Sequence, residues 1–513
     1  MGKYGRSEIY TDYREVTYSN VVKILQDAMP THLANVSRMN FLLDFDAGIQ
    51  PLPREKKTRK DIDIKCIDNL AHQAVSFNEA YHWGNPITFV QRGLKDSNDD
   101  TDREAEAIAL LNECYSAEKT DAKTQMLGRF IEITGIAYTF VDVNMDWQEG
   151  DSYFSYETLD PRFAFVVKSS KLGHKPMLGV TYSEDSMGNR YFTCFSDKNR
   201  FEISAGKIVN GEKKQKKKDQ ATMYDWFQDE RSGELNPLGR IPIIECILGY
   251  DRMGCFEREI DALCSLNLLE SDICNATDET VQAIWHSNDV VFPTDEEGNV
   301  MKPEHGDWLQ TFTSTDGKTP FVTPLSLNFD YGGNINFVNA KRAYLLEQLC
   351  IPSRNDNSGG STGIAMDSAT GWNAAENKAN AIENLTKGWK MEEAKVALEA
   401  IKQSPFVPAD SPLLKLKAMD IVPSIKRNKN YELTVKTQAM ATLFNMGVYP
   451  KHVIDKGDLF PDAHQVWVDS KDTMLELQQS KITKKEEKTV ESTTSDDPIN
   501  QIENSPNLDK DRG

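Results

Sequence analysis

A long alanine-rich segment that directly follows a cluster of glycines constrains this chain more than any other feature. Residues 373–402 contain seven alanines among Glu and Lys and no proline, which favours one uninterrupted α-helix. At 1.5 Å per residue, such a helix is about 45 Å long. Residues 358–363 hold three glycines, whose freedom at positive φ gives a loop many conformers. We therefore expect a loop attached to the end of a rigid helix.

Helical spacing predicts two further helices before this loop, with short β-type runs between them. The first helix covers residues 255–284 and the second covers residues 335–349. Between them, residues 290–292, 308–312 and 321–322 have strand character and are separated by turn sequences, among them Tyr331-Gly332-Gly333. This order predicts a hairpin of helices that carries a small strand-rich lobe.

Composition limits the class of protein. A chain of 513 residues is long enough for several domains or lobes. Its 39% hydrophobic and 27% charged residues are typical of a soluble globular protein, and it has no run of eighteen apolar residues for a membrane span. The N-terminus has no secretory signal, so we expect a cytoplasmic protein. The eight cysteines form no Cys-x-x-Cys pair, which predicts reduced, mostly buried thiols and neither a zinc site nor a disulfide framework.

The formal net charge of −20 opposes tight binding to nucleic acid, because sequence-independent binding needs many cations to neutralise phosphates. The only dense basic run, at residues 213–218, is expected in a solvated turn. Any contact with DNA should therefore be loose.

The rest of the chain reads as a mixture of helices and strands. Apolar spacing predicts helices over residues 20–28, 32–43, 62–81, 102–114 and 121–133. Strands are predicted over residues 137–143, 163–167, 178–182, 190–195, 201–203 and 221–224, with residues 241–245 closing the same lobe. Short helices are predicted over residues 431–448, 450–456 and 464–479, and residues 481–513 have the composition of a disordered tail.

Motifs for catalysis or cofactor binding are not found in the sequence. The glycine loop lacks the Gly-x-x-x-x-Gly-Lys-Ser/Thr pattern, and the dispersed histidines form no metal-binding pair. Residues 142–146 begin like a calcium loop, but Trp147 and Tyr153 stand where glycine and glutamate are needed. We expect no cofactor and no metal, although carboxylates brought together by folding would still permit catalysis.

Three short motifs suggest a family. They are Tyr81-His82-Trp83-Gly84-Asn85-Pro86-Ile87 at the end of a predicted helix, Gly239-Arg240-Ile241-Pro242-Ile243-Ile244-Glu245, and Ser361-Thr362-Gly363-Ile364-Ala365-Met366. With this order of elements, residues 21–477 resemble the portal proteins of tailed bacteriophages, in the family typical of long-tailed phages of Gram-positive hosts.

The resemblance implies an α+β, multi-lobed chain that assembles into a ring, usually of twelve copies, at one vertex of the virion capsid. Double-stranded DNA passes through the ring without sequence-specific binding, driven by the terminase large subunit. The major capsid and scaffolding proteins and a head-completion or connector protein would be further partners, with assembly in the host cytoplasm and no membrane. The implied parts are a flexible N-terminus (1–20), wing (21–254), stem helix 1 (255–284), clip (285–334), stem helix 2 (335–352), tunnel loop (353–371), long wing helix (372–403), crown (404–480) and disordered tail (481–513).

The same resemblance assigns candidate site residues in three groups. The tunnel loop that lines the DNA channel would contain Arg354, Asn355, Asp356, Asn357, Ser358, Gly359, Gly360, Ser361, Thr362 and Gly363. The stem would present Glu257, Glu259, Asp261, Glu270, Asp272, Lys341 and Arg342, and the partner-binding edge of the clip would present Asp295, Glu296, Glu297 and His305. Acidic stem helices would lower adhesion to DNA, while Lys341, Arg342 and Arg354 would graze phosphates. Asp356 offsets the charge of Arg354, which favours a steric over an electrostatic role for the loop.

Simpler interpretations stay open. The glycines also fit an ordinary surface loop, the stem acids a solvated helix face, and Trp372 and Trp389 packing positions. At the level of the whole protein, the alternatives are a virion adaptor or scaffold that never encircles DNA, and a carboxylate-based hydrolase or divergent nucleotidyltransferase. A closed ring with a central hole distinguishes the first alternative, and a compact pocket with converging acids would support the second.

Overall fold

The structure is a computed structural model. It describes residues 5–52, 60–92, 99–207, 224–228, 233–281, 284–288, 290–291, 294–299, 301, 310–311, 319, 321–325, 330–352, 371–427, 433–457, 467, 470–474 and 476. The chain divides into two units, Met1–Asn428 and Lys429–Gly513. Helices and strands are both abundant in the first unit, which confirms the predicted α+β class.

A seven-stranded sheet has the order β1-β5-β6-β7-β8-β10, with β9 paired to β8. Its strands are β1 (Ile9–Thr11), β5 (Ala164–Ser169), β6 (Pro176–Glu184), β7 (Arg190–Phe195), β8 (Asn199–Lys207), β9 (Tyr224–Gln228) and β10 (Glu234–Leu235). Strand β1 runs parallel to β5, and the other neighbours are antiparallel. The predicted meander is thus confirmed from β5 to β8.

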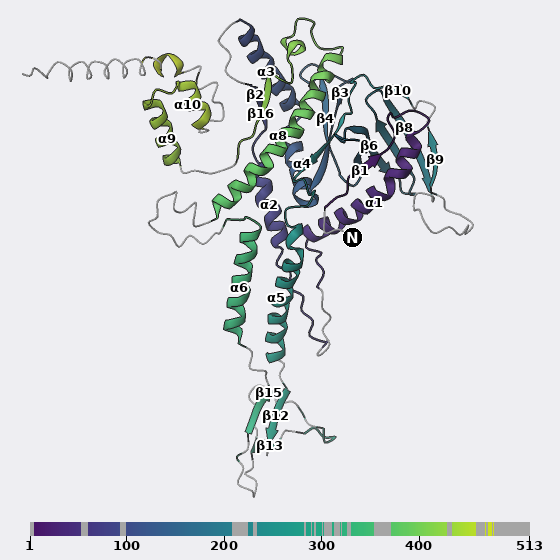
Figure 1. Cartoon of the computed structure of the whole chain (residues 1–513). Helices are drawn as coiled ribbons and strands as arrows, with labels where there is room; N and C mark the ends of the chain where they lie inside the picture. Colours follow the sequence, from purple (N-terminus) through teal and green to yellow (C-terminus); the bar gives the residue numbers. More distant parts are fainter. Residues whose placement is uncertain are drawn as a thin grey trace, which may run out of the picture. The chain divides into compact units, whose positions relative to one another are not determined.

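Helix α1 (Val21–Asp46) packs on this sheet through one apolar cluster that includes Leu25, Met29 and Phe165 (Figure 1). Separate helices were expected on either side of Pro30, but α1 continues through it. A proline inside a helix costs roughly 3 kcal/mol because it removes one hydrogen bond and crowds the preceding turn. Here the apolar residues on both sides of Pro30 bury against the same sheet, which offsets that cost.

The chain before α1 differs from the expected flexible N-terminus, because Arg6, Ile9 and Thr11 are buried and residues 9–11 form a strand. The side chain of Arg6 is 0% exposed and forms an ion pair with Glu257. Its Nε donates to the carbonyl of Arg252 at 3.1 Å. Together with the pairing of β1 to β5, these contacts fasten residues 5–20 to the first unit.

A second layer combines helices with a three-stranded sheet of order β11-β3-β4. It contains α2 (Leu70–Trp83), β2 (Thr88–Gln91), α3 (Asp99–Ala117), α4 (Thr120–Thr134), β3 (Ile136–Val143), β4 (Phe154–Leu159), β11 (Ile243–Ile247), a 3-10 turn (Pro412–Lys415) and β16 (Ile421–Ser424). Residues 241–245 were expected to close the strand-rich lobe, and β11 pairs there with β3 in this separate sheet. Strand β16 pairs with β2 across more than three hundred residues of chain.

Helix α8 (Trp372–Gln403) packs against β3 and β11 and confirms the predicted long helix. Its 32 residues give a length of about 48 Å. The helix starts after Gly371, whose φ of 86° suits glycine, and ends before Pro405. Trp389, Ala397 and Ile401 lie on its buried side, within the largest apolar cluster of this layer.

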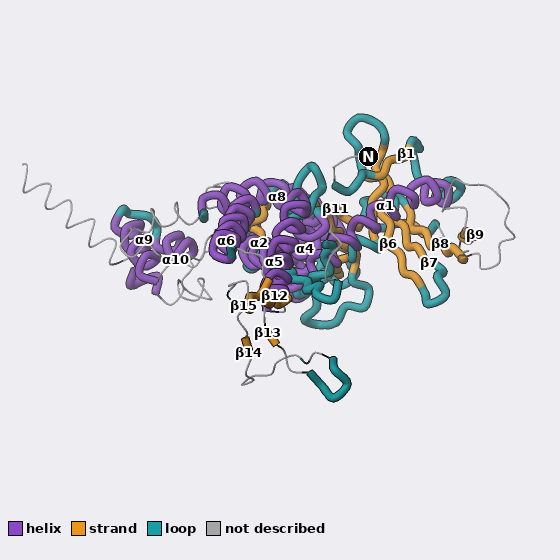
Figure 2. The backbone as a smooth tube through the Cα atoms, turned by 90° about the horizontal axis from the view of Figure 1, so that it is seen from below, coloured by secondary structure: helices purple, strands orange, loops and turns teal. Residues whose placement is uncertain are grey.

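Two paired helices and short strand pairs complete the first unit (Figures 1 and 2). The elements are a 3-10 turn (Glu257–Glu259), α5 (Ile260–Val281), β12 (Ile284–Asn288), β13 (Val290–Val291), β14 (Gln310–Thr311), β15 (Phe321–Leu325) and α6 (Tyr331–Gln348). Strand β12 pairs with β15 and β13 pairs with β14, both antiparallel. The hairpin of helices with a strand-rich insertion is therefore confirmed.

The start of α6 differs from the prediction. Tyr331-Gly332-Gly333 was interpreted as a turn before the helix, but it forms the first helical turn. The side chain of Asp330 accepts a hydrogen bond from the Gly333 N–H at 2.9 Å and caps the helix. This cap offsets the low helix propensity of the two glycines.

In the second unit, α9 (Leu433–Asn445) and α10 (Pro450–Gly457) pack together, with Val453 and Ile454 buried. Both helices were predicted. The predicted helix over 464–479 is described only in part, and the tail 481–513 and the basic run 213–218 lie outside the described residues.

Candidate functional site

The helix pair α5 and α6 is held together along its length by polar contacts. Near the body of the first unit, the Lys341 Nζ donates to the Ser265 hydroxyl at 2.6 Å. Near the strand insertion, the hydroxyls of Thr280 and Tyr331 lie 2.8 Å apart, and the Tyr331 hydroxyl donates to the Ala276 carbonyl at 3.2 Å. These contacts fix one helix against the other at both ends.

Apolar packing embeds one end of the pair in the body of the first unit. Leu266 of α5 and Leu345 of α6 are fully buried in a cluster that also contains Phe45 of α1 and Leu70 of α2. Phe45 stacks on Phe256, with ring centroids 5.6 Å apart. The helix pair is therefore anchored in the apolar core of the first unit.

A second face of α6 carries large apolar side chains that are open to solvent in the single chain. Phe337 and Tyr344, seven residues apart and so on one helical face, are 58% and 57% exposed. Val338 and Leu345 are the only side chains of α6 that are buried. These two aromatic side chains make this face of α6 a candidate contact surface.

An extended strap segment (residues 60–69) runs along α5. Asn275 accepts from the Ile64 N–H at 2.7 Å and donates to the Ile64 carbonyl at 3.2 Å. One turn earlier on α5, the Ser271 hydroxyl accepts from the Cys66 N–H at 3.0 Å. Its single proton is shared between the Asn267 carbonyl at 2.7 Å and the Cys66 carbonyl at 3.3 Å. These side chains therefore replace a neighbouring strand as partners for the strap backbone.

Asn267 of α5 makes a third such contact by accepting from the Asp68 N–H at 2.9 Å. We call the contacts of Asn275, Ser271 and Asn267 with the strap backbone the hydrogen-bond ladder. The ladder works because four helical residues rise about 6 Å and two extended residues rise about 6.6 Å, so the two spacings nearly match. Sequence reasoning missed the strap and expected a helix from residue 62. The signal was the four-residue spacing of three polar residues on one face of α5, Asn267, Ser271 and Asn275.

The predicted stem acids lie in different environments. Glu257 pairs with Arg6 and accepts from the Gly254 N–H at 3.0 Å, so it stabilises the base of α5. Asp261 is exposed, whereas Glu259 and Asp272 are half-buried. Burial and then the neighbouring Asp68 raise the pKa of Glu270.

Of the two predicted stem cations, Arg342 forms an ion pair with Asp68 of the strap segment at 3.2 Å and is 44% exposed. Lys341 is engaged by Ser265, as described above. Both positive charges are thus directed toward partners in the same chain.

The predicted clip acids form an exposed turn. Asp295 accepts hydrogen bonds from the N–H groups of Glu297 at 3.0 Å and Asn299 at 2.7 Å. The bonds from Asn299, followed by that from Glu297, lower the pKa of Asp295. Glu296 and Glu297 themselves are exposed, and His305 lies outside the described residues.

The predicted tunnel-loop residues 354–363 also lie outside the described residues, but the chain on either side of them is described. A Cβ added at Gly371 would lie 3.8 Å from the Cα of Pro352, so the two ends of segment 353–370 are adjacent. The Lys378 Nζ of α8 also donates to the Leu349 carbonyl at the end of α6, at 3.4 Å. Helix α8 therefore begins where α6 ends, with the loop attached at their junction.

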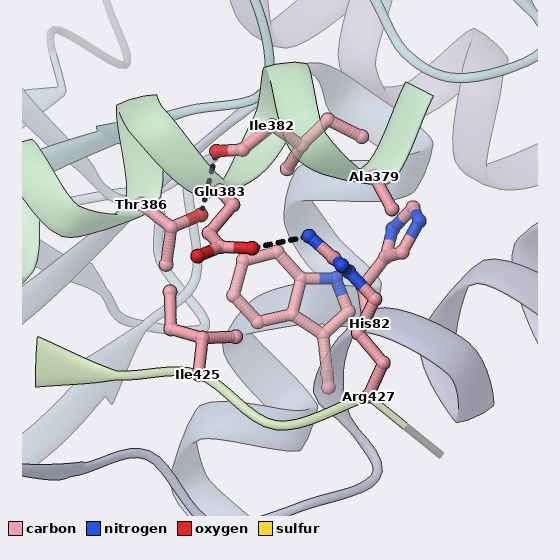
Figure 3. Close-up of a pocket in the computed structure, with 8 residues that line it drawn as sticks. His82, Ala379, Ile382, Glu383, Thr386, Ile425 and Arg427 are labelled. Carbon is pink, nitrogen blue, oxygen red and sulfur yellow. Dashed lines mark hydrogen bonds and ion pairs between the residues drawn. The ribbon is translucent and has the colours of Figure 1, made fainter. Parts of the chain in front are cut away.

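Figure 3 shows a small hollow beneath the first half of α8. Arg427 forms ion pairs there with Glu376 and Glu383 and donates to the Asn380 side chain at 3.0 Å. The hollow has a volume of about 10 Å³, room for a single water molecule. These contacts attach the chain after β16 to α8.

A larger cleft of about 1080 Å³ lies between α8 and the sheets. Its buried acid, Glu245, is paired with Arg252 and with Lys168 at 2.6 Å. Burial opposes ionisation of Glu245, but these two cations outweigh it and lower its pKa. Among the described residues, no three His, Cys, Asp or Glu side chains are placed to hold a metal ion. No described helix is long and apolar enough to cross a membrane.

Comparison with protein families decides the relationship that the motifs suggested. A family described as "phage portal protein, SPP1 Gp6-like" matches residues 6–452, most of the chain. The chain belongs to this phage portal protein family. No curated protein matches it. The portal protein is accordingly a bacteriophage virion component of the head-tail connection, and its described elements include the helix pair, the strand insertion and the long helix expected from the resemblance.

Proposed function

We propose that this portal protein forms a closed ring of about twelve copies at one capsid vertex. Terminase packages double-stranded DNA through the ring, and the DNA later leaves by the same channel. The family match supports this role, and the exposed Phe337 and Tyr344 on α6 are the observation that carries the ring. A cyclic ring joins two different faces of each subunit, so an apolar helix face that the described residues leave exposed suits a lateral contact.

The parts of the fold receive the following roles in this proposal. Residues 255–284, which contain α5, and residues 335–352, which contain most of α6, form the stem. Residues 285–334 form the clip, residues 353–371 the tunnel loop and α8 the long wing helix. The wing comprises residues 21–254, and we now add the ordered arm from residue 5. Because β16 pairs with β2, we start the crown at Lys429 and not at residue 404. Residues 481–513 are proposed as a tail that the ring does not need.

Weak adhesion to DNA follows from the charges. A net charge of −20 repels a polyanion, and binding without sequence preference requires cations that release counterions. Arg342 is paired with the Asp68 carboxylate, which offsets its charge, whereas Lys341 donates to the neutral Ser265 hydroxyl and keeps its charge. The tunnel loop, with Arg354 offset by Asp356, would then follow the DNA surface mainly by its shape.

The partners follow from the same assignment. The exposed acidic turn at Asp295 places negative charge on the clip, where we propose that the terminase large subunit and later the head-completion or connector protein dock. The major capsid and scaffolding proteins would surround the ring during assembly in the host cytoplasm. The portal itself would be non-catalytic, with ATP turnover assigned to the terminase.

The mass of the purified full-length protein in solution tests this proposal. Twelve chains of 58.0 kDa give a particle of about 700 kDa, which native mass spectrometry resolves from rings of neighbouring size. A closed assembly of about twelve copies is expected. A monomer or dimer at the concentrations of assembly would contradict the ring and favour an adaptor or a small enzyme.

A further inference from the structure

Two cysteines meet where the strap segment lies on α5. The Sγ atoms of Cys66 and Cys274 are 3.1 Å apart, although both thiols are free. A disulfide bond is about 2.05 Å long, so closing it requires an approach of about 1 Å. Both side chains are half-buried, which leaves them within reach of a small oxidant, whereas Cys114, Cys194, Cys246 and Cys264 are buried.

The hydrogen-bond ladder holds these two sulfurs in position. The Cys66 N–H donates to the Ser271 hydroxyl at 3.0 Å. Ser271 stands three residues before Cys274 on α5 and so on a neighbouring part of the same helical face. The rungs at Asn275 and Asn267 fix the strap on either side of Cys66. The contact between the thiols is therefore set by the register of the strap, because a shift by one residue would turn Cys66 away.

We propose that Cys66 and Cys274 are an intramolecular disulfide site, which fastens the strap segment to α5 when the protein meets an oxidising environment. In a reducing cytoplasm the two residues remain thiols. This inference depends on the two sulfurs and the strap, and it does not require that the protein form a ring.

A small-molecule disulfide such as oxidised glutathione supplies the oxidising equivalents. The thiolate of one cysteine attacks the small disulfide, forms a mixed disulfide and releases one glutathione thiolate, which takes up the proton lost by the cysteine. The second cysteine then attacks its neighbour's sulfur, and the second glutathione leaves with the second proton. Two cysteine thiols are thus oxidised to one disulfide, while one glutathione disulfide is reduced to two thiols.

The reduced pair should react slowly at neutral pH. The hydrogen bond between the thiols, followed by burial, raises the pKa of Cys66 to about 11. Since the thiolate is the nucleophile, few molecules have a reactive Cys66 at any moment. Once formed, the disulfide would close a loop between two cysteines that are 208 positions apart in the sequence. The strap could then leave α5 only after the disulfide is cleaved.

Counting thiols in the full-length protein tests the proposal. The protein is incubated with oxidised glutathione or with dithiothreitol, denatured, alkylated and mapped by mass spectrometry without reduction. We expect two fewer alkylated thiols per chain after oxidation, a peptide that links Cys66 to Cys274, and full reversal by dithiothreitol. Cys66→Ser and Cys274→Ser should each abolish the link. Cys350→Ser, at another half-buried thiol, is the matched control and should leave it unchanged.

Three results would overturn the disulfide site: all eight thiols still alkylated, glutathione bound separately to Cys66 and Cys274, or a link between two chains. A second measurement tests the fastening itself. Lys65 is exposed in the strap, so trypsin cleavage after it should be several-fold slower in oxidised than in reduced protein. Equal cleavage rates in the presence of the link would contradict the fastening of the strap.

Discussion

Lys390 and Glu393, one turn apart on α8, form an ion pair inside the first unit, with 2.8 Å between Nζ and Oε1. The side chains are only 3% and 0% exposed. The Lys390 ammonium also lies over the ring of Tyr156, 5.2 Å from its centroid. A buried charge is tolerated only while its partner is present, so each member of this pair depends on the other. The contact of Lys390 with Tyr156 of β4 joins the helix to the sheet.

Removing one partner of this pair should destabilise the fold strongly. Lys390→Met is expected to lower the free energy of unfolding by about 3–5 kcal/mol, because it leaves the Glu393 carboxylate buried and unpaired. Urea unfolding followed by circular dichroism measures the change. The double variant Lys390→Met with Glu393→Met should recover most of the loss, and a double variant no more stable than the single would contradict the account.

A second buried carboxylate should make stability depend on pH. Glu132 accepts from Asn78 at 2.9 Å, from Trp83 at 3.3 Å, and lies 3.1 Å from the Nδ1 of His82. Burial opposes its ionisation, but His82, followed by Lys378 and Asn78, outweighs burial and lowers its pKa. A lowered pKa in the folded state gives stability that is fully present above the unfolded pKa of about 4.3 and is lost as pH falls through the folded value.

Glu132→Gln should therefore lower the free energy of unfolding more at pH 6 than at pH 3.5. Urea unfolding at the two pH values measures this difference. Glu113→Gln, at an exposed site, is the control and should change little at either pH. If Glu132→Gln lowers the free energy of unfolding equally at both pH values, the negative charge of Glu132 does not contribute to stability.

The strap segment should loosen when its ladder is cut. Asn275→Ala removes the two hydrogen bonds to Ile64 and is expected to cost about 1–2 kcal/mol. Hydrogen exchange at the Ile64 amide should accelerate by the factor that this loss of free energy implies for local opening of the strap. Thr277→Ala is the control on the exposed side of α5, since its hydroxyl bonds only within the helix, to the Ile273 carbonyl. Unchanged exchange at Ile64 in Asn275→Ala would contradict the ladder.

Assembly should be sensitive to the exposed face of α6. Phe337→Asp places a charge in the proposed lateral contact and should shift the native mass from the ring toward single chains. Asn336→Asp adds the same charge at the neighbouring exposed position on another helical face. The Asn336→Asp control should form rings normally. Intact rings of Phe337→Asp would show that this face of α6 is not part of the interface between subunits.

Charge on the clip should matter for packaging. Reversal of Glu296 and Glu297 to Lys leaves the turn-forming Asp295 in place and should lower DNA packaging with purified terminase, because it repels a complementary basic surface. Asp146→Lys with Glu149→Lys reverses two exposed acids in a turn of the body and serves as the control. Packaging at the normal level after clip reversal would contradict docking through these acids.

Local signals predicted much of the fold. The alanine-rich composition of residues 373–402 gave α8 almost to the residue, because helix propensity adds up along an uninterrupted segment. The strand β7 (Arg190–Phe195) was also predicted with its bounds, since alternation and flanking turns define a strand in a meander.

The errors arose where distant contacts decide local structure. Residues 62–69 have helical spacing, but Asn267, Ser271 and Asn275 of α5 offer their backbone better partners in an extended form. The sheet that β11 joins also depends on a segment a hundred residues away. The exposed aromatic face of α6 could not be found from spacing, because Phe337 and Tyr344 look like core residues in a sequence.

Cryo-electron microscopy of the purified full-length protein, without imposed symmetry, tests the central claim most directly. The account predicts a closed ring of about twelve subunits in which α5 and α6 surround a central hole wide enough for duplex DNA, with Phe337 and Tyr344 covered by the adjacent subunit. An open or compact assembly without such a hole, or a ring in which these two side chains stay exposed to solvent, would contradict it.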